Sequence, residues 1–133
     1  MLHKELTGQI IESFYKVYNK LGYGFLEKVY ENALCAELKN QSLGVISQFP
    51  IQVYYKNEPV GEYFADILVE DKVIVELKAA EFIRREHEFQ LINYLKATKA
   101  EVGILLNFGR KPDFKRKIYT NTNKNQRKPV RSV

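Results

Sequence analysis

Two short apolar runs constrain the fold of this chain more than any other stretch. Residues 64–69 (FADILV) and 73–78 (VIVELK) have the composition of buried strands, and only three residues separate them. Each run nevertheless carries charge, because Asp66 lies in the first and Glu76 and Lys78 lie in the second. Burying a charged group costs free energy unless the group is paired or binds a metal. These three residues therefore require an explanation.

The apolar pattern selects one register for an antiparallel hairpin of these two runs. A two-residue turn places charge on both faces, whereas a three-residue loop at 70–72 leaves one face wholly apolar. Because side chains alternate along a strand, a slip of one residue moves the whole apolar set to the other face. The apolar face then pairs Val69 with Val73, Ile67 with Val75 and Ala65 with Leu77. The opposite face pairs Leu68 with Ile74, Asp66 with Glu76 and Phe64 with Lys78.

This register predicts two neighbouring carboxylates with a lysine two residues further along the same face. Opposed carboxylates repel each other, and a divalent cation between them turns the repulsion into a binding site. Such a metal suits phosphodiester hydrolysis, since it polarises the phosphoryl group and lowers the pKa of a bound water. Lys78 is placed to orient that water or to stabilise developing charge. The competing interpretation is a structural ion pair, in which Lys78 neutralises Asp66 or Glu76.

Length and composition indicate one globular domain in a reducing compartment. The 133 residues form enough core for a single domain, and the single cysteine, Cys35, excludes an internal disulfide framework. No apolar run approaches the ~20 residues of a membrane span, and the N-terminus lacks a signal-peptide pattern. We therefore expect a cytoplasmic protein with no membrane partner.

Positive charge gathers at the C-terminal end. Residues 110–133 contain nine Lys or Arg and one acid, so that segment is +8, while the remaining 12 basic and 15 acidic residues give −3. A basic segment binds phosphate backbones without sequence preference, although a solvated end has the same composition. We take Lys115, Arg116 and Lys117 as candidate substrate-binding residues. The domain is predicted to cover 1–120, followed by a basic, flexible tail at 121–133.

Hydrophobic periodicity predicts an α/β domain with the order helix, helix, three strands, helix, strand. The helices are expected at about 5–21, 25–39 and 81–98, the last with Phe82, Phe89, Ile92 and Leu95 on its core side. Strands are expected at 45–47 and 51–55, which form one interrupted strand, at 64–69, at 73–78 and at 102–108, with an edge strand at 115–119. A parallel pairing of the 102–108 strand through the 81–98 helix makes a right-handed crossover.

Five short motifs together resemble the GxxExxY proteins. These motifs are GFLEKVY at 24–30, DILV at 66–69, VELKA at 75–79, QLINYL at 90–95 and LNFG at 106–109, and the resemblance spans about residues 5–119. The GxxExxY proteins are grouped with the PD-(D/E)XK nuclease superfamily, so the resemblance implies a restriction-endonuclease-like fold, a mixed sheet flanked by helices. It also implies that Asp66, Glu76 and Lys78 are the central catalytic residues and that Glu27 completes the site.

The resemblance implies a nuclease that depends on Mg²⁺ or Mn²⁺ and acts on nucleic acid, expected to be DNA. The metal would be held by Asp66, Glu76 and the backbone carbonyl of Leu77. Gln90 and Tyr94 look like the helix motif of RecB-type nuclease domains and would line the site or touch DNA. The alternative is a non-catalytic nucleic-acid- or protein-binding module on the same fold. A homodimer is compatible with either function.

The chain departs from the family pattern at three places. Tyr18 stands where the family often has a histidine, and Gly22-Tyr23-Gly24 stands where it often has a Gly-Pro-Gly turn. Phe64 stands where a basic residue often precedes the motif aspartate by two positions. None of these changes removes a metal ligand, but the one at Phe64 removes a positive charge that would help to bind phosphate.

Overall fold

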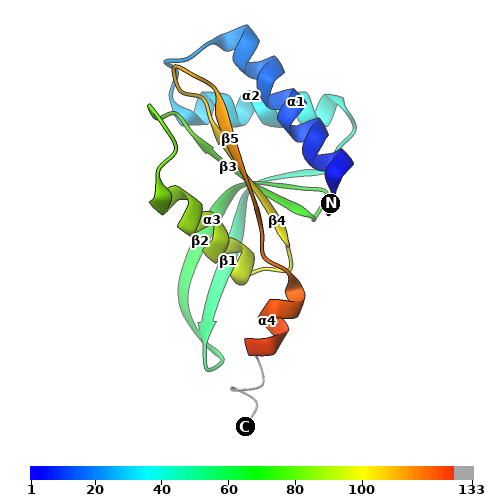
Figure 1. Ribbon diagram of the computed structural model, residues 1–133, viewed down its shortest axis with the longest axis vertical. Coiled ribbons are helices and arrows are strands. Elements are labelled where there is room, and N and C mark those ends of the chain that lie inside the picture. Colours follow the sequence, from blue (N-terminus) through cyan, green and yellow to red (C-terminus); the bar gives the residue numbers. More distant parts are fainter. Residues whose placement is uncertain (128–133) are drawn as a thin grey trace.

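A computed structural model of the chain describes residues 1–127 and shows a five-stranded sheet with helices on both faces (Figure 1). The elements are α1 (Lys4–Leu21), α2 (Glu27–Asn40), β1 (Val45–Tyr55), β2 (Glu58–Val69), β3 (Val73–Lys78), α3 (Arg85–Lys96), β4 (Val102–Asn107), β5 (Asp113–Ile118) and α4 (Asn121–Arg127). The predicted α/β fold class is confirmed. No helix within 1–127 is long and apolar enough to cross a membrane.

The strands lie in chain order across the sheet, β1-β2-β3-β4-β5. Only β3 and β4 run parallel, and α3 connects them, while the other neighbouring pairs are antiparallel. This agrees with the parallel crossover expected from the sequence. Since β3 and β4 are both buried, they read as nearly continuous apolar runs.

The hairpin register predicted from the apolar pattern holds for the three pairs nearest the turn. Val69 pairs with Val73, Leu68 with Ile74 and Ile67 with Val75. The ladder ends there, so the predicted pairing of Ala65 with Leu77 is wrong. Leu77 packs under α1 and α2, whereas Ala65 packs with Leu68 on the α3 side. The alternation of β2 is therefore broken next to Asp66, where the strand leaves its partner.

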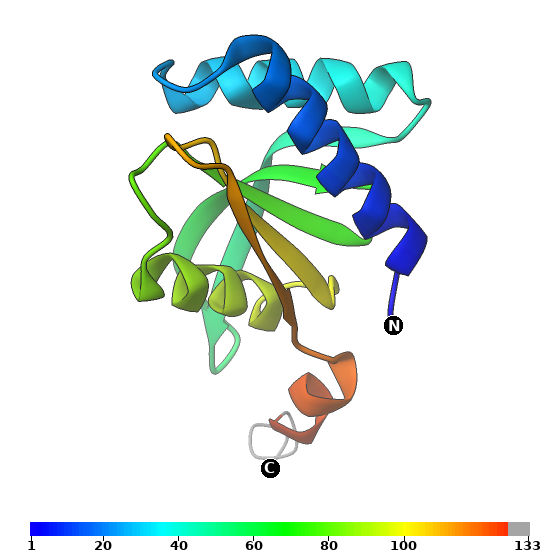
Figure 2. The ribbon, with the colours of Figure 1, turned by 45° about the horizontal axis from the view of Figure 1, so that its top comes forward.

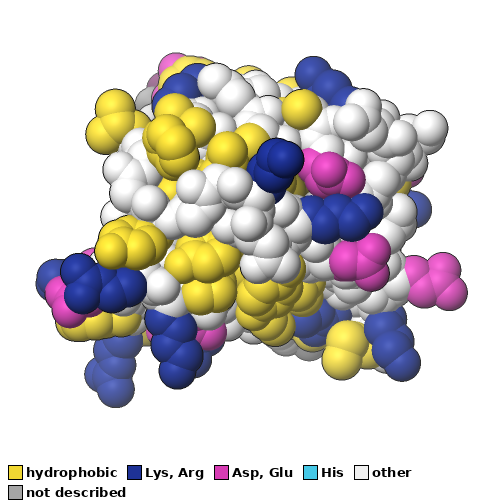
Figure 3. Space-filling model, turned by 90° about the horizontal axis from the view of Figure 1, so that it is seen from above, with side chains coloured by type: hydrophobic (Ala, Val, Ile, Leu, Met, Phe, Trp, Pro, Cys, Tyr) yellow, Lys and Arg dark blue, Asp and Glu magenta, His cyan; other side chains and the backbone are white. Residues whose placement is uncertain are grey.

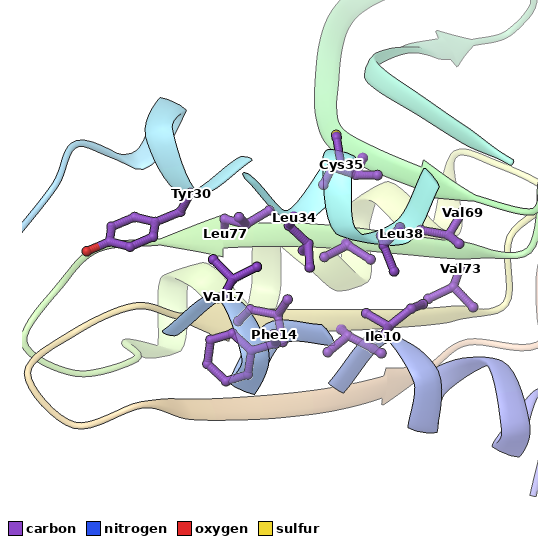
Figure 4. Packing of buried hydrophobic residues seen from close by; sticks show 14 of the residues in the cluster. Ile10, Phe14, Val17, Tyr30, Leu34, Cys35, Leu38, Val69, Val73 and Leu77 are labelled. Atoms are coloured by element: carbon purple, nitrogen blue, oxygen red, sulfur yellow. The ribbon is translucent and has the colours of Figure 1, made fainter. Parts of the chain in front are cut away.

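Two apolar cores hold the helices on the sheet. In the larger core, Ile10, Phe14 and Val17 of α1 meet α2 and one face of the central strands (Figure 4). Tyr30 of α2 stacks on Phe108, with ring centroids 4.3 Å apart. The smaller core packs Leu91, Tyr94 and Leu95 of α3 against the opposite face. The candidate site lies at one end of the central strands, where the helices of both layers come close to the sheet.

Two predictions about the helices are corrected. Phe82 and Phe89 were expected on the core side of the third helix, but they are 59% and 62% exposed. The helix begins only at Arg85, so Phe82 lies in the preceding loop, and Leu91 and Leu95 carry the packing. Residues 121–127 form α4, where a tail without a helical pattern was expected. The remainder of that predicted tail, 128–133, lies outside the described residues.

Three loops gather at one end of the molecule, on the left in both ribbon views (Figures 1 and 2). They connect α1 to α2, β3 to α3 and β4 to β5. Asn107 joins two of them, because its amide accepts from the N–H of Ala80 and donates to the carbonyl of Ala80, both at 3.0 Å. Ligands of α/β sheets bind beyond the carboxyl ends of parallel strands, and this is that end of β3 and β4.

Replacing Gly109 with alanine is expected to destabilise the protein. A Cβ at this position would lie 2.1 Å from the carbonyl oxygen of Ala80, which the backbone must move to avoid. We expect a loss of about 1–3 kcal/mol, measured by thermal or urea unfolding. Gly8→Ala is the control: it lies inside α1 with nothing within 4 Å of a Cβ, and it should stabilise by about 0.5–1 kcal/mol. Equal effects of the two changes would contradict the close approach at Gly109.

Candidate active site

Asp66 and Glu76 are interlocked at the point where the β2–β3 ladder ends. The N–H of Asp66 donates to Glu76 Oε2 at 2.6 Å, and the N–H of Leu77 donates to Asp66 Oδ2 at 2.8 Å. Each carboxylate thus accepts a hydrogen bond from a backbone N–H group that the pairing of β2 with β3 no longer satisfies. The two side chains that sequence reasoning placed together do lie together, although the predicted partners beyond them do not.

Desolvation opposes the ionisation of both carboxyl groups. Desolvation, and after it the charge of the neighbouring Asp66, raises the pKa of Glu76 to about 8. Desolvation also raises the pKa of Asp66, against the hydrogen bond from Leu77. Glu31 adds a further repulsion at Asp66. A pair of this kind binds a proton or a cation at neutral pH, since both carboxylates cannot easily be charged alone.

The structural ion pair weighed from the sequence is absent from residues 1–127. The nearest basic group, Lys78, lowers the pKa of both acids by its charge, but it makes no ion pair with either. The oxygens that remain, Asp66 Oδ1 and Glu76 Oε1, accept no hydrogen bond from the described residues. The acids are therefore not neutralised by this part of the chain.

Glu27 approaches the same strand ends from the first residue of α2. Its Oε2 accepts a hydrogen bond from the N–H of Ala79 at 3.4 Å, one residue beyond Lys78. Its charge acts on both Asp66 and Glu76. The structure thus brings Glu27, Asp66, Glu76 and Lys78 to one end of the sheet, as the sequence motifs implied.

Glu31 is a site neighbour to which sequence reasoning gave no role. It is buried one turn after Glu27, and it accepts hydrogen bonds from Ser47 at 2.7 Å and from Gln48 at 3.0 Å. Gln48 has a φ of 55° and lies opposite Asp66 between the paired positions of β1 and β2. The spacing of Glu27 and Glu31 on one helix face was the available signal, but only the fold shows that Glu31 lies near Asp66.

Tyr94 of α3 lies near the acid pair. Its pKa is raised to about 12, first by burial and then by the charges of Glu76 and Asp66, so its hydroxyl lies near the pair and stays protonated. Gln90 is one turn earlier on the same helix and is half-buried. His87 caps α3 by accepting from the N–H of Arg84 at 3.2 Å. The pKa of His87 is lowered by burial and then by Lys78.

The three basic residues predicted to bind substrate point to different faces of β5. The guanidinium of Arg116 donates to the carbonyl of Leu2, and Lys117 pairs with Glu88 of α3 at 2.6 Å. Both are occupied within the chain. Lys115 is exposed. It pairs with Leu105 of β4, which in turn pairs with Glu76 of β3, so Lys115 and Glu76 lie in one cross-strand row. Of the three, Lys115 has the best placement to meet a phosphate.

The rim of the site combines apolar and basic groups. The turn before α2 exposes Tyr23, Phe25 and Leu26, the last by 80%. Arg110, in the loop after β4, lies over the ring of Tyr23 at 5.6 Å. Seen from above, hydrophobic side chains and Lys or Arg share the left half of the surface, the side toward which the three loops point (Figure 3).

The donor set fits a hard divalent cation. No group of three or more His, Cys, Asp or Glu side chains poised to hold a metal occurs within 1–127. Mg²⁺ does not need such a group, because it usually keeps several waters and takes one or two carboxylates together with substrate phosphate. Two adjacent carboxylates, each with one oxygen free of hydrogen bonds from residues 1–127, meet that requirement.

A mixed sheet between helical layers, with an acid pair and a lysine at the strand ends, is the architecture of restriction-endonuclease-like proteins. A family model described as the PD-(D/E)XK nuclease superfamily matches residues 4–118. The chain belongs to this superfamily. The match runs from the start of α1 to the end of β5, so it includes every candidate site residue named above.

A solved structure supports the fold assignment independently. The crystal structure of SSO0001 superposes with a TM-score of 0.57 at 15% sequence identity. The alignment covers 78% of this chain but 56% of SSO0001, so the present chain spans little more than half the length of that protein. At this identity the likeness concerns the fold alone. No curated protein sequence matches the chain.

Proposed function

We propose that the protein is a metal-dependent nuclease that hydrolyses phosphodiester bonds of nucleic acid, in the first instance DNA. The observation that supports this most is the adjacent pair of the half-buried Asp66 and the buried Glu76, neither of which makes an ion pair within residues 1–127. Two such carboxyl groups held together are costly to the fold unless a cation joins them. The motifs that resemble GxxExxY proteins are compatible with this assignment.

In the proposed mechanism, Asp66, Glu76 and the backbone carbonyl of Leu77 would hold Mg²⁺ or Mn²⁺. When bound there, such an ion would supply Lewis-acid chemistry toward the phosphoryl group and a water. Lys78 orients the attacking water and stabilises the negative charge that develops on the phosphoryl oxygens. Glu27, whose Oε2 accepts from the N–H of Ala79, assists through a second metal or a water. Tyr94 remains protonated at neutral pH, so it donates a hydrogen bond toward the substrate.

Removing the metal is expected to abolish cleavage. Single-stranded, duplex and branched DNA and single-stranded RNA are incubated with the protein in Mg²⁺, in Mn²⁺ and in EDTA, and products are resolved on denaturing gels. Cleavage should appear with Mg²⁺ or Mn²⁺, should vanish in EDTA and should return when the ion is restored. Asp66→Asn, which keeps an oxygen to accept from Leu77, is the matched inactive variant. Cleavage in EDTA, or full activity of Asp66→Asn, would contradict the proposal.

The alternative function is a non-catalytic module that uses the same fold to bind nucleic acid or a partner protein. It predicts substrate binding in EDTA with no cleavage under any metal condition. The exposed apolar and basic rim formed by Tyr23, Leu26 and Arg110 is the observation that favours it.

A further inference from the structure

A groove of about 1060 Å³ lies between the β1–β2 hairpin, α3 and the start of α4. In Figure 1, α3 runs next to this hairpin and α4 follows below it. The residues that matter for its chemistry are Tyr54, Tyr63, Phe89, Gln90, Asn93 and Tyr94. The groove has no role in the mechanism derived above, apart from Tyr94 at its inner end.

Aromatic rings line the groove from two sides. Tyr54 of β1 is 60% exposed, Phe89 of α3 is 62% exposed and Tyr63 of β2 is 49% exposed. Tyr63 lies against Tyr94 with ring centroids 5.7 Å apart. Single exposed aromatic residues are common on protein surfaces, but rings that gather around one groove mark a binding site. A planar, partly apolar ligand would bury them.

Polar and charged groups are interleaved with these rings. Gln52, Gln90 and Asn93 offer amide donors and acceptors along the groove. Lys96, Lys99 and Lys124 lie among its lining residues, against one acid, Glu86. Lys124 donates to the carbonyls of Thr98 and Ala100 at 2.8 and 2.7 Å. The exposed Lys96 and Lys99 leave the groove positive, which favours an anionic ligand.

The groove and the candidate active site share one residue, Tyr94. Tyr94 lines the groove and at the same time lies close enough to Glu76 and Asp66 for their charges to act on its hydroxyl. Gln90 lies one turn away on the same side of α3.

We infer that this groove binds the unpaired bases of a single nucleic-acid strand, by stacking on Tyr54, Tyr63 and Phe89, with its phosphates toward Lys96 and Lys99. The position of the cleaved bond at Asp66 and Glu76 rests on the proposed function. In a duplex, neighbouring base pairs cover both faces of every base, so protruding rings of this kind have nothing to stack on. The substrate class is thus an unpaired strand, or an unpaired segment that flanks a duplex.

The test measures binding without cleavage, in EDTA, by fluorescence anisotropy. The probes are a fluorescent DNA strand, the RNA strand of the same sequence and the corresponding DNA duplex. The wild-type protein should bind a strand more tightly than the duplex, and the comparison of the two strands decides between DNA and RNA. Tyr54→Ala and Phe89→Ala should each weaken strand binding between about 5-fold and 100-fold. Thermal unfolding of each variant confirms that it folds.

Tyr55→Ala is the matched control, because Tyr55 is the next residue on β1, is 65% exposed and does not line the groove. It should leave binding unchanged. Equal affinity for strand and duplex, unchanged binding by both groove variants, or an equal loss in Tyr55→Ala would overturn the inference. Cleavage of duplex that neither groove variant affects would overturn it and leave the proposed nuclease intact. Strand binding with no cleavage in any metal would leave the groove intact and remove the nuclease.

Discussion

Replacing Glu76 with glutamine is expected to raise the unfolding temperature of the metal-free protein at pH 8 and to abolish its response to Mg²⁺. The folded protein holds a proton on Glu76 up to a pKa of about 8, mainly because burial opposes the charge. The amide of glutamine is neutral at every pH and keeps an oxygen that accepts from the N–H of Asp66. The variant thus removes the cost of the charge and keeps the hydrogen bond.

The pH dependence follows from the direction of this shift. An unfolded glutamate loses its proton at its ordinary pKa of 4.5, whereas the folded one keeps it to about 8. Between these values the folded state binds more protons, so the metal-free protein loses stability as the pH rises from about 4.5 to 8. The raised pKa of Asp66 acts in the same direction. Bound metal replaces the proton, so protection by Mg²⁺ should grow over the same range.

Thermal unfolding in EDTA at pH 5 and pH 8 measures both effects. We expect the wild-type unfolding temperature to fall by at least about 5 °C between these values, and that of Glu76→Gln to fall less. Glu88→Gln is the control of opposite sign, because the pKa of Glu88 is lowered by its hydrogen bond to Lys117. It should lose a little stability at pH 8. A wild-type protein more stable at pH 8 than at pH 5 without metal would contradict the buried, unpaired acid.

Replacing Lys78 with alanine is expected to lower the cleavage rate by about 100-fold or more while metal binding remains. Lys78 is half-buried beside the acid pair without an ion pair to either acid, so its ammonium is available to the attacking water. Loss of an electrostatic donor that acts only in the transition state lowers kcat and leaves substrate affinity largely intact.

Single-turnover cleavage and Mg²⁺-dependent thermal protection, measured on the same preparations, separate these roles. Lys72→Ala serves as the control, since it removes the same charge from the exposed β2–β3 turn. It should change neither measurement. Full-rate cleavage by Lys78→Ala would sink the assigned mechanism, whereas loss of metal protection would mean that Lys78 organises the acid pair instead.

The register of the central hairpin could be predicted from sequence because its two faces differ so sharply. Only the register that pairs Val69 with Val73 and Ile67 with Val75 keeps one face apolar, and both pairs are observed. The prediction failed at Ala65, because alternation cannot reveal that a strand bends away from its partner. At that bend the carboxylates of Asp66 and Glu76 accept hydrogen bonds from backbone N–H groups. Strand propensity carries no information about such side-chain contacts.

The buried face of the third helix was predicted only in part. Leu95 is buried and Ile92 packs against the smaller core as expected, but Phe89 is exposed and Leu91 takes its place in the core. The choice is made by Gly103, whose missing side chain lets Leu91 pack against β4; a Cβ there would lie 2.6 Å from Leu91. That contact joins residues on two elements, and local periodicity carries no information about it. Phe89 is left facing the groove.

The interlocked hydrogen bonds of Asp66 and Glu76 also affect how this site can decay during divergence. Because both carboxylates complete strand pairing, a descendant that abandons chemistry loses stability if it replaces either acid with a residue that has no hydrogen-bond acceptor at this position. Lys78 makes no ion pair with either acid, so in such a descendant we expect Lys78 to be substituted before the acids are. Among descendants, retention of the two acids alone would therefore be a relic of folding, and retention of the lysine with them would mark a working enzyme.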